Sequence, residues 1–123
     1  MNAKLATINL EVADPQSSKR FYIDALDMVE NLDRSHAPGF VYLESAGASV
    51  TLATPQTAAT AEPSRTMELG FEVDDVVALL RRFSEFGTHD FVSQSMGWGD
   101  VLEGHDPDGH RVIVYRFREP SGA

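Results

Sequence analysis

The chain has 123 residues, of which 42% are hydrophobic, and its 19 acidic and 10 basic residues give a formal net charge of -9. This is enough for one domain with a proper core, and the absence of cysteine excludes disulfides, thiolate metal sites and thiol nucleophiles. The negative charge repels nucleic acid and anionic membranes, so we expect neither as a partner; it mildly favours cationic ligands or serves solubility.

The sequence also shows no sign of membrane insertion or export. No apolar stretch approaches the roughly 18 to 20 residues that span a bilayer. The N-terminus has neither the basic start nor the apolar segment of a signal peptide. We therefore expect a cytoplasmic protein.

The chain opens with strict alternation of apolar and polar residues over residues 4–12, which predicts a strand with one buried face. Asp14 then supplies a helix N-cap, and Pro15 takes the first helical position. Apolar residues at helical spacing continue to Leu26 and predict a helix that packs on the sheet. Further strands are predicted at residues 28–32, 40–44 and 49–53. Module one, residues 1–54, therefore has the order βαβββ.

A second module repeats this plan. Residues 55–65 are rich in Pro, Ala, Thr, Gln and Glu without periodicity and indicate a linker. Residues 68–87 then align with residues 7–26, so that apolar positions match and Asp75 falls on Asp14. The expected elements of module two, residues 66–120, are a strand at 67–73, a helix capped at Asp74 or Asp75 and ended by Gly87, and strands at 90–95, 98–103 and 110–117. We predict one α+β domain, residues 1–123, built of two βαβββ modules with curved mixed sheets.

Three features together carry a family resemblance. They are the run D-x-x-x-S-x-x-F-Y-x-x-x-L from Asp14 to Leu26, the duplicated βαβββ spacing, and the turn DPDG at residues 106–109 before a final apolar strand. This combination resembles the vicinal oxygen chelate superfamily, over nearly the whole chain. That superfamily contains glyoxalase I, extradiol dioxygenases, fosfomycin-resistance enzymes and bleomycin-resistance binding proteins, so it includes metalloenzymes and metal-free binders. Asp27 stands where the family usually has glycine.

The resemblance also implies where a metal would bind. The superfamily's enzymes use His or Glu at one inward position on each of four strands, and the matching positions here are Thr7, Thr51, Glu68 and Ile113. A divalent ion in such a site needs about three protein ligands, and only Glu68 is a suitable one. The four histidines show no i, i+4 ligand spacing. We therefore expect neither a metal nor any other cofactor.

The remaining inward positions predict a cup of carboxylates, aromatic rings and one arginine, which is the usual composition of a small-molecule site. The predicted ligand-binding residues are Asn9, Glu11, Phe40, Tyr42, Thr51, Glu68, Glu72, Phe91, Met96, Trp98, Arg111 and Tyr115. Trp98 lies between two glycines on a predicted strand, which favours close ligand approach and a stacking role over a surface or dimer contact. Core packing of Phe40 and Phe91 and solvation of Glu11 and Glu72 are the alternatives.

Two classes of function fit these features. The first is a metal-free binding protein, similar to the bleomycin-resistance proteins, that sequesters a small aromatic antibiotic or toxic natural product. The acidic balance of the chain would also suit a cationic ligand of this kind. The second is an enzyme of the same superfamily, an isomerase, cyclase, lyase or dioxygenase. There an inward carboxylate would act as general base while Arg111 stabilises an oxyanion, or an unrecognised metal site would operate. We favour the first class. Because open sheet faces must be covered, we also expect a homodimer.

Overall fold

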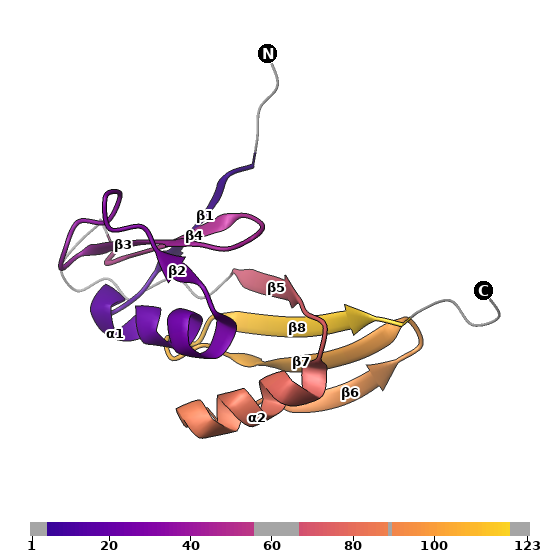
Figure 1. Ribbon diagram of the computed structural model, residues 1–123. Coiled ribbons are helices and arrows are strands. Elements are labelled where there is room, and N and C mark those ends of the chain that lie inside the picture. Colours follow the sequence, from indigo (N-terminus) through magenta and orange to yellow (C-terminus); the bar gives the residue numbers. More distant parts are fainter. Residues whose placement is uncertain (1–4, 56–66, 89, 119–123) are drawn as a thin grey trace, which may run out of the picture. The chain divides into compact units, whose positions relative to one another are not determined.

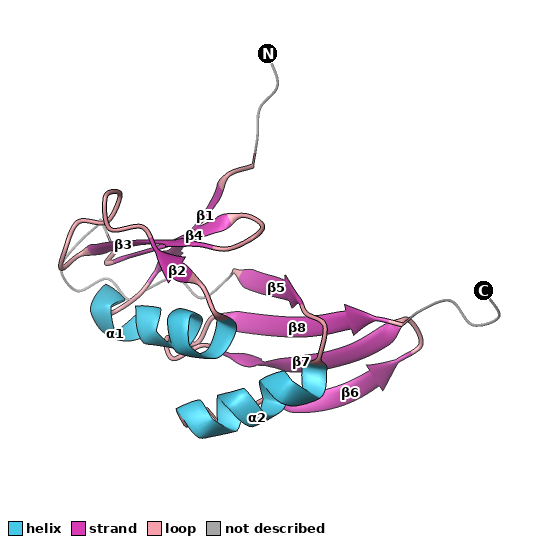
Figure 2. Cartoon of the chain, in the orientation of Figure 1, coloured by secondary structure: helices cyan, strands magenta, loops and turns pink. Residues whose placement is uncertain are grey.

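The computed structural model describes residues 5–55, 67–88 and 90–118. The chain divides into two compact units, Met1–Arg65 and Thr66–Ala123. Each unit has two layers, a helical layer on one face of a four-stranded sheet (Figure 1, Figure 2). Residues 56–66, which include most of the predicted linker, and residue 4 of the first predicted strand lie outside the described residues.

The first unit contains a mixed sheet in the order β1-β4-β3-β2. Its strands are β1 (Thr7–Glu11), β2 (Val29–Glu30), β3 (Phe40–Glu44) and β4 (Ser49–Ala53), and its helices are α1 (Pro15–Arg20) and the π-helical turn η1 (Phe21–Ala25). β1 is parallel to β4, and the other neighbours are antiparallel. Two predicted strands, 40–44 and 49–53, have the observed bounds, whereas the predicted strand 28–32 shrinks to two residues.

The ends of the first helix follow from its sequence. Asp14 caps it as predicted, because its carboxylate accepts the Gln16 N–H and the Ser17 hydroxyl, each at 3.0 Å, while Pro15 occupies the first turn. The π-helical turn η1 ends close to Asp27, which has a φ of 57°. Aspartate is one of the few residues that tolerate this left-handed conformation, so Asp27 fills the place of the family's usual glycine.

The alternation of apolar and polar residues along the strands determines which face of the first sheet the helix covers. Alternate strand residues on the helical side are fully or nearly buried, as are the helical residues Phe21 and Tyr22. The buried strand residues are Leu10, Val41, Leu43, Val50 and Leu52. The residues between them face away from the helix and form what we call the open face of unit one.

The second unit has the same topology, with the sheet order β5-β8-β7-β6. Its elements are β5 (Glu68–Glu72), α2 (Val76–Phe86), β6 (Val92–Met96), β7 (Gly99–His105) and β8 (Arg111–Phe117). The predicted helix signals are confirmed: the Asp75 carboxylate accepts the Ala78 N–H at 3.0 Å, and Gly87 ends the helix with a φ of 106°. Two βαβββ modules are therefore present. Within the described residues, no helix is long and apolar enough to cross a membrane.

The structure corrects the predicted strand 98–103. Met96 pairs with Gly99 in the β6–β7 ladder, so Gly97 and Trp98 form a two-residue hairpin connection. Trp98 is therefore a turn residue, and β7 runs from Gly99 to His105. The two glycines around Trp98 indicated a need for backbone freedom. Glycine is typical both of an irregular strand and of a tight turn, so this signal could not distinguish the two.

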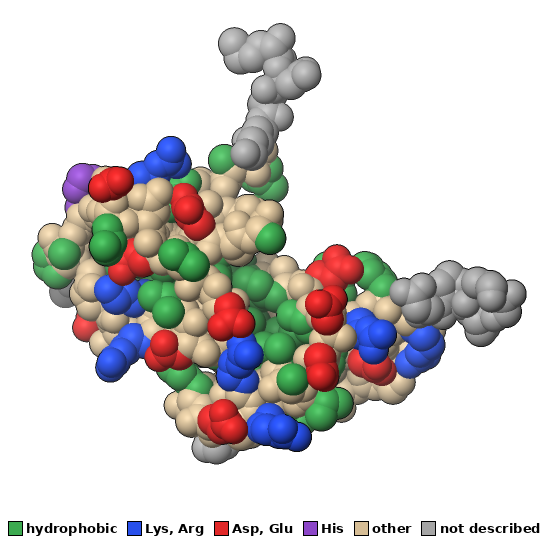
Figure 3. Space-filling model, in the orientation of Figure 1, with side chains coloured by type: hydrophobic (Ala, Val, Ile, Leu, Met, Phe, Trp, Pro, Cys, Tyr) green, Lys and Arg blue, Asp and Glu red, His purple; other side chains and the backbone are tan. Residues whose placement is uncertain are grey.

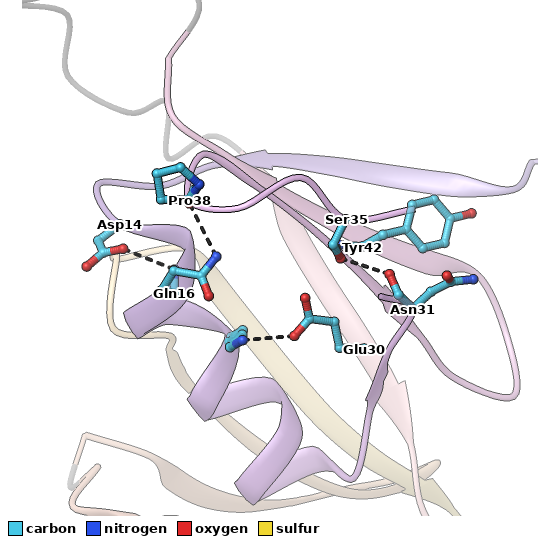
Figure 4. A network of polar contacts seen from close by, with 8 residues as sticks. Asp14, Gln16, Glu30, Asn31, Ser35, Pro38 and Tyr42 are labelled. Atoms are coloured by element: carbon cyan, nitrogen blue, oxygen red, sulfur yellow. Dashed lines mark hydrogen bonds and ion pairs between the residues drawn. The ribbon is translucent and has the colours of Figure 1, made fainter. Parts of the chain in front are cut away.

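One ion pair ties the first helix to the edge of its sheet. The Lys19 ammonium lies 2.8 Å from a carboxylate oxygen of Glu30 on β2 (Figure 4). The two side chains are only 26% and 13% exposed. The hydrogen bond from Lys19 is the main reason that the pKa of Glu30 lies below its ordinary value of 4.5, and it outweighs burial, which acts in the opposite direction.

We predict that Lys19→Met lowers the free energy of unfolding by about 1 kcal/mol at neutral pH. Because the folded-state pKa of Glu30 is depressed, the contribution is present above pH 4.5 and is lost as the pH falls below it. Urea unfolding of both proteins at successive pH values measures this. Arg81→Met, on the exposed face of α2, is the control. A difference that stays constant from pH 7 into the acid range would mean that Lys19 acts through packing alone.

Candidate functional site

The face of the second sheet that points away from α2 carries most of the predicted site residues of this unit. Register places Glu68 beside Arg111, Gly70 beside Ile113 and Glu72 beside Tyr115. On the other side of β8, the β7 residues Gly99, Val101 and Glu103 pair in register with Phe117, Tyr115 and Ile113, respectively. We call this surface the open face of unit two. On these three strands its members are Glu68, Gly70, Glu72, Gly99, Val101, Glu103, His105, Arg111, Ile113, Tyr115 and Phe117.

Arg111 is bound by two carboxylates at one end of this face. Its Nε lies 2.9 Å from Glu68 on β5, and its Nη2 donates to Glu103 on β7. The guanidinium thus links three strands, and its charge is matched locally. The oxyanion-stabilising role considered from the sequence would require this guanidinium to serve an oxyanion in addition to its two carboxylate partners. Glu103 was not among the predicted site residues, although it alternates with Val101 on one strand.

Three aromatic rings gather at the other end of the open face. Ring centroids of Trp98 and Tyr115 lie 6.1 Å apart, those of Trp98 and Phe117 5.6 Å, and those of Tyr115 and Phe117 5.3 Å. Trp98 is 47% exposed and Phe117 is 54% exposed. We call these three residues the aromatic cluster. Phe117 was missed, although it follows Tyr115 at the strand period of two and so points the same way.

Two glycines allow close packing next to the cluster, one against a ring and one against the β8 backbone. A Cβ atom on Gly70 would lie 3.4 Å from Cε1 of Tyr115, so this ring rests against the bare backbone of β5. A Cβ atom on Gly99 would lie only 2.1 Å from the carbonyl oxygen of Arg116. This close approach of β7 to β8 fixes the start of β7, and the Arg118 N–H donates to the Trp98 carbonyl at 2.8 Å. The backbone of Trp98 is therefore positioned from both sides.

Phe91 does not belong to this face, and its predicted place in the cup is corrected. Its ring stacks on Phe83 of α2 with centroids 4.1 Å apart, and it is 7% exposed. A Cβ atom on Gly104 would lie 2.7 Å from this ring, so Phe91 is packed between α2 and β7. It is a core residue because the chain enters β6 from the helical side. Met96, at the end of β6, is exposed and pairs with Gly99 of the open face.

The other predicted residues lie on the open face of unit one. Thr51 of β4 has Asn9 of β1 on one side and Tyr42 of β3 on the other. The Thr51 hydroxyl donates to Oδ1 of Asn9 at 2.6 Å. Glu11 and Phe40 each pair in register with Ala53 at the far end of the same face. The predicted site residues thus form two sets, one on each unit.

The residues at the four implied metal positions do not fit a divalent ion. The Thr51 hydroxyl is directed at Asn9, the Glu68 carboxylate is bound to Arg111, and Ile113 has no donor atom. Thr7 offers only a neutral hydroxyl, a poor ligand for a transition metal. In the part of the chain that the structure describes, no three His, Asp or Glu side chains lie close enough together to hold an ion.

The duplicated βαβββ topology agrees with comparisons to known proteins. The sequence profile of the Glyoxalase/Bleomycin resistance protein/Dioxygenase superfamily matches residues 4–122. The chain belongs to this superfamily. No curated protein matches the chain significantly.

Solved structures of superfamily type share the fold at low sequence identity. A lactoylglutathione lyase from Agrobacterium tumefaciens has a TM-score of 0.74 at 17% identity, with 94% of this chain and 95% of that chain covered. A glyoxalase-related enzyme from Fulvimarina pelagi has a TM-score of 0.74 at 20% identity, with 94% and 88% covered. An integron cassette protein from the mobile metagenome of V. cholerae has a TM-score of 0.69 at 20% identity, with 96% and 98% covered. At these identities the likeness concerns the fold alone.

The two glycines that flank Trp98 provide a matched pair of tests. We predict that Gly99→Ala lowers the free energy of unfolding by about 1 to 3 kcal/mol, because the new methyl group must displace the β8 backbone. The shift also changes the fluorescence of Trp98, the single tryptophan. Gly97→Ala is the control, since a Cβ there meets nothing within 4 Å. Urea unfolding followed by tryptophan emission compares them, and equal stabilities would contradict the close approach at Gly99.

Proposed function

We propose that this superfamily member is a metal-independent binding protein that sequesters a planar aromatic antibiotic or toxic natural product, as bleomycin-resistance proteins do for their ligands. The observation that carries the proposal is the aromatic cluster of Trp98, Tyr115 and Phe117, half-exposed on an open sheet face. The poor fit of the implied metal positions supports binding without a metal. The four matched positions do not supply the ligand set that the family's metal-assisted catalysis needs.

The geometry of the cluster suits a flat ligand. Aromatic rings prefer edge-to-face or offset contacts with centroids about 4.5 to 7 Å apart, and each such contact adds roughly 0.5 to 1.5 kcal/mol beyond area burial. The Trp98 ring is inclined by 76° to Tyr115 and by 55° to Phe117, so the three rings do not cover one another's faces. Ring surface is left for a fourth planar group, and most of its binding energy would come from buried area.

The charges on the same face favour a ligand with a positive group. Glu68, Glu72 and Glu103 stand against the single Arg111 on this face, which leaves an excess of negative charge. Glu72 pairs in register with Tyr115 and so lies next to the aromatic cluster. On the side of the molecule that Figure 3 shows, acidic and basic side chains are interspersed. A cation on the ligand would be attracted by Glu72 while the planar part contacts the rings.

We also propose that the protein acts as a homodimer. Both open faces carry exposed apolar or aromatic side chains that association would cover. The edge strand β6 is fully exposed, and its sequence VSQSM has no charged residue, so two copies can approach there despite the net charge of -9.

Sedimentation at tens of micromolar protein tests the assembly. We predict a species of twice the chain mass of 13.5 kDa. Gln94→Lys, in the middle of β6, places like charges opposite each other in a paired edge and should shift the equilibrium toward monomer. A wild-type protein that sediments at 13.5 kDa under these conditions would exclude the dimer.

The ligand itself can be sought by quenching of Trp98 with a panel of neutral and cationic aromatic natural products. For a compound that binds, we predict that Trp98→Ala weakens the affinity by at least about thirtyfold, since removal of a buried aromatic anchor typically costs about 2 kcal/mol or more. Trp98→Phe, which keeps a ring, should lose less. Calorimetric titration measures all three proteins, and circular dichroism checks that each is folded.

A cationic ligand should also bind more weakly as salt rises, because the attraction to Glu72 is screened. If wild type and Trp98→Ala bind equally well, the aromatic cluster is not the site. Chemical conversion of a bound compound would favour the enzyme class instead.

A further inference from the structure

A hollow lies wholly on unit one, at the end of the β3–β4 hairpin. It has a volume of about 430 Å³. One side is formed by the polar residues Arg34, Tyr42 and Glu44, and the rest is mainly small or apolar. The lining residues are Leu5, Ala6, Arg34, Tyr42, Glu44, Ala46, Gly47, Ala48 and Ser49. None of them belongs to the aromatic cluster of unit two.

Arg34 presents a positive charge to this hollow. Its Nη1 lies 3.3 Å from the Tyr42 hydroxyl, and its Cζ lies 5.3 Å from the centre of the Tyr42 ring. Among the described residues, that phenol hydroxyl is the only hydrogen-bond acceptor in contact with the guanidinium. Arginine has five N–H donors in a planar fork, so most of them face outward. In a chain with a net charge of -9, an arginine held by a neutral group is well suited to receive an anion.

The loop that carries Arg34 is held in place by hydrogen bonds to β3. The Asn31 side chain accepts the Arg34 N–H at 3.1 Å, and the Asn31 N–H donates to the Tyr42 carbonyl at 2.8 Å. The Ser35 hydroxyl donates to the Asn31 carbonyl at 2.9 Å and accepts the Tyr42 N–H at 3.0 Å. Figure 4 shows Asn31 and Ser35 beside Tyr42, whose ring points away from the helix. The cation is therefore positioned before any ligand arrives, which lowers the entropy cost of binding.

Glu44 limits which anions this hollow can accept. Its carboxylate accepts the Asn31 Nδ2 hydrogen bond at 2.9 Å. It lies on the same face of β3 as Tyr42, two residues along the strand, or about 6 to 7 Å. A ligand with a second negative charge would meet Glu44, whereas a neutral apolar group can rest on Leu5, Ala46 and Ala48.

We propose that this hollow binds a small amphipathic monocarboxylate. The carboxylate receives the outward N–H groups of Arg34, and the apolar part of the ligand covers the side chains of Leu5, Ala46 and Ala48. This site is separate from the aromatic cluster in sequence and in unit, so it adds a second ligand class to the proposed function and does not depend on it.

Benzoate and its neutral isostere benzamide are the probes. In two-dimensional NMR of the isotope-labelled full chain, benzoate should shift the amide signals of residues 46–49, and benzamide at the same concentrations should not. We predict that Arg34→Gln weakens benzoate binding by about tenfold or more, as expected for loss of a charge-assisted hydrogen bond. Arg81→Gln, on the exposed face of α2, makes the same change in net charge and should leave the affinity unchanged.

Two further variants separate the possible outcomes. Arg34→Lys keeps the charge without the planar fork and should fall between wild type and Arg34→Gln. Trp98→Ala should bind benzoate as wild type does, so failure of the aromatic site leaves this proposal intact. Three outcomes would overturn the proposal. The first is equal affinity of the wild type for benzoate and benzamide, and the second is equal affinity of the wild type and a folded Arg34→Gln variant for benzoate. The third is tighter binding of phthalate than of benzoate.

Discussion

The packing of one helix on one face of each four-stranded sheet is the constraint that governs the other features of this protein. It commits alternate residues of the covered strands to a buried core, with Leu43 and Leu52 in the first unit and Leu102 and Val112 in the second fully buried. The residues between them face away from the helices, and some of them, such as Tyr42 and Tyr115, stay partly exposed. Both candidate sites combine such strand residues with residues of the adjoining loops and turns, Arg34 in the first unit and Trp98 in the second.

Local sequence signals explain why so much of the fold was predictable. Alternation located β3, β4, β5 and β8 within about one residue and the start of β1 within three, and the helix signals at Asp14, Asp75 and Gly87 act over one turn of chain. The caps depend on backbone groups two or three residues away, so no tertiary information is needed. The duplication followed from the match of residues 68–87 to residues 7–26, and the profile match confirms the resemblance to the superfamily. The order of the strands in each sheet was not predicted.

The site was less predictable because its residues are positioned by contacts distant in sequence. Trp98 was placed on a strand, since nothing local shows that Met96 pairs with Gly99 and leaves two residues for the turn. Phe91 was placed in the cup because its direction depends on stacking with Phe83 from the preceding helix. The carboxylate pair around Arg111 required the register of three strands, which fixes Glu103 beside Ile113 and within reach of the guanidinium. The ligand-binding role of these residues stays a prediction.

The open face of each unit carries a tyrosine, although the two occupy different places in the duplicated scaffold, since β8 of unit two corresponds to β4 of unit one. On β8, in the second unit, Tyr115 joins two other rings. On β3, in the first unit, Tyr42 instead lies under the guanidinium of Arg34. A tyrosine on an open sheet face can therefore support either an aromatic or a cationic surface, depending on which loop folds over it. Because each unit has its own buried core, side chains on the open face of one unit can change without disturbing the packing of the other.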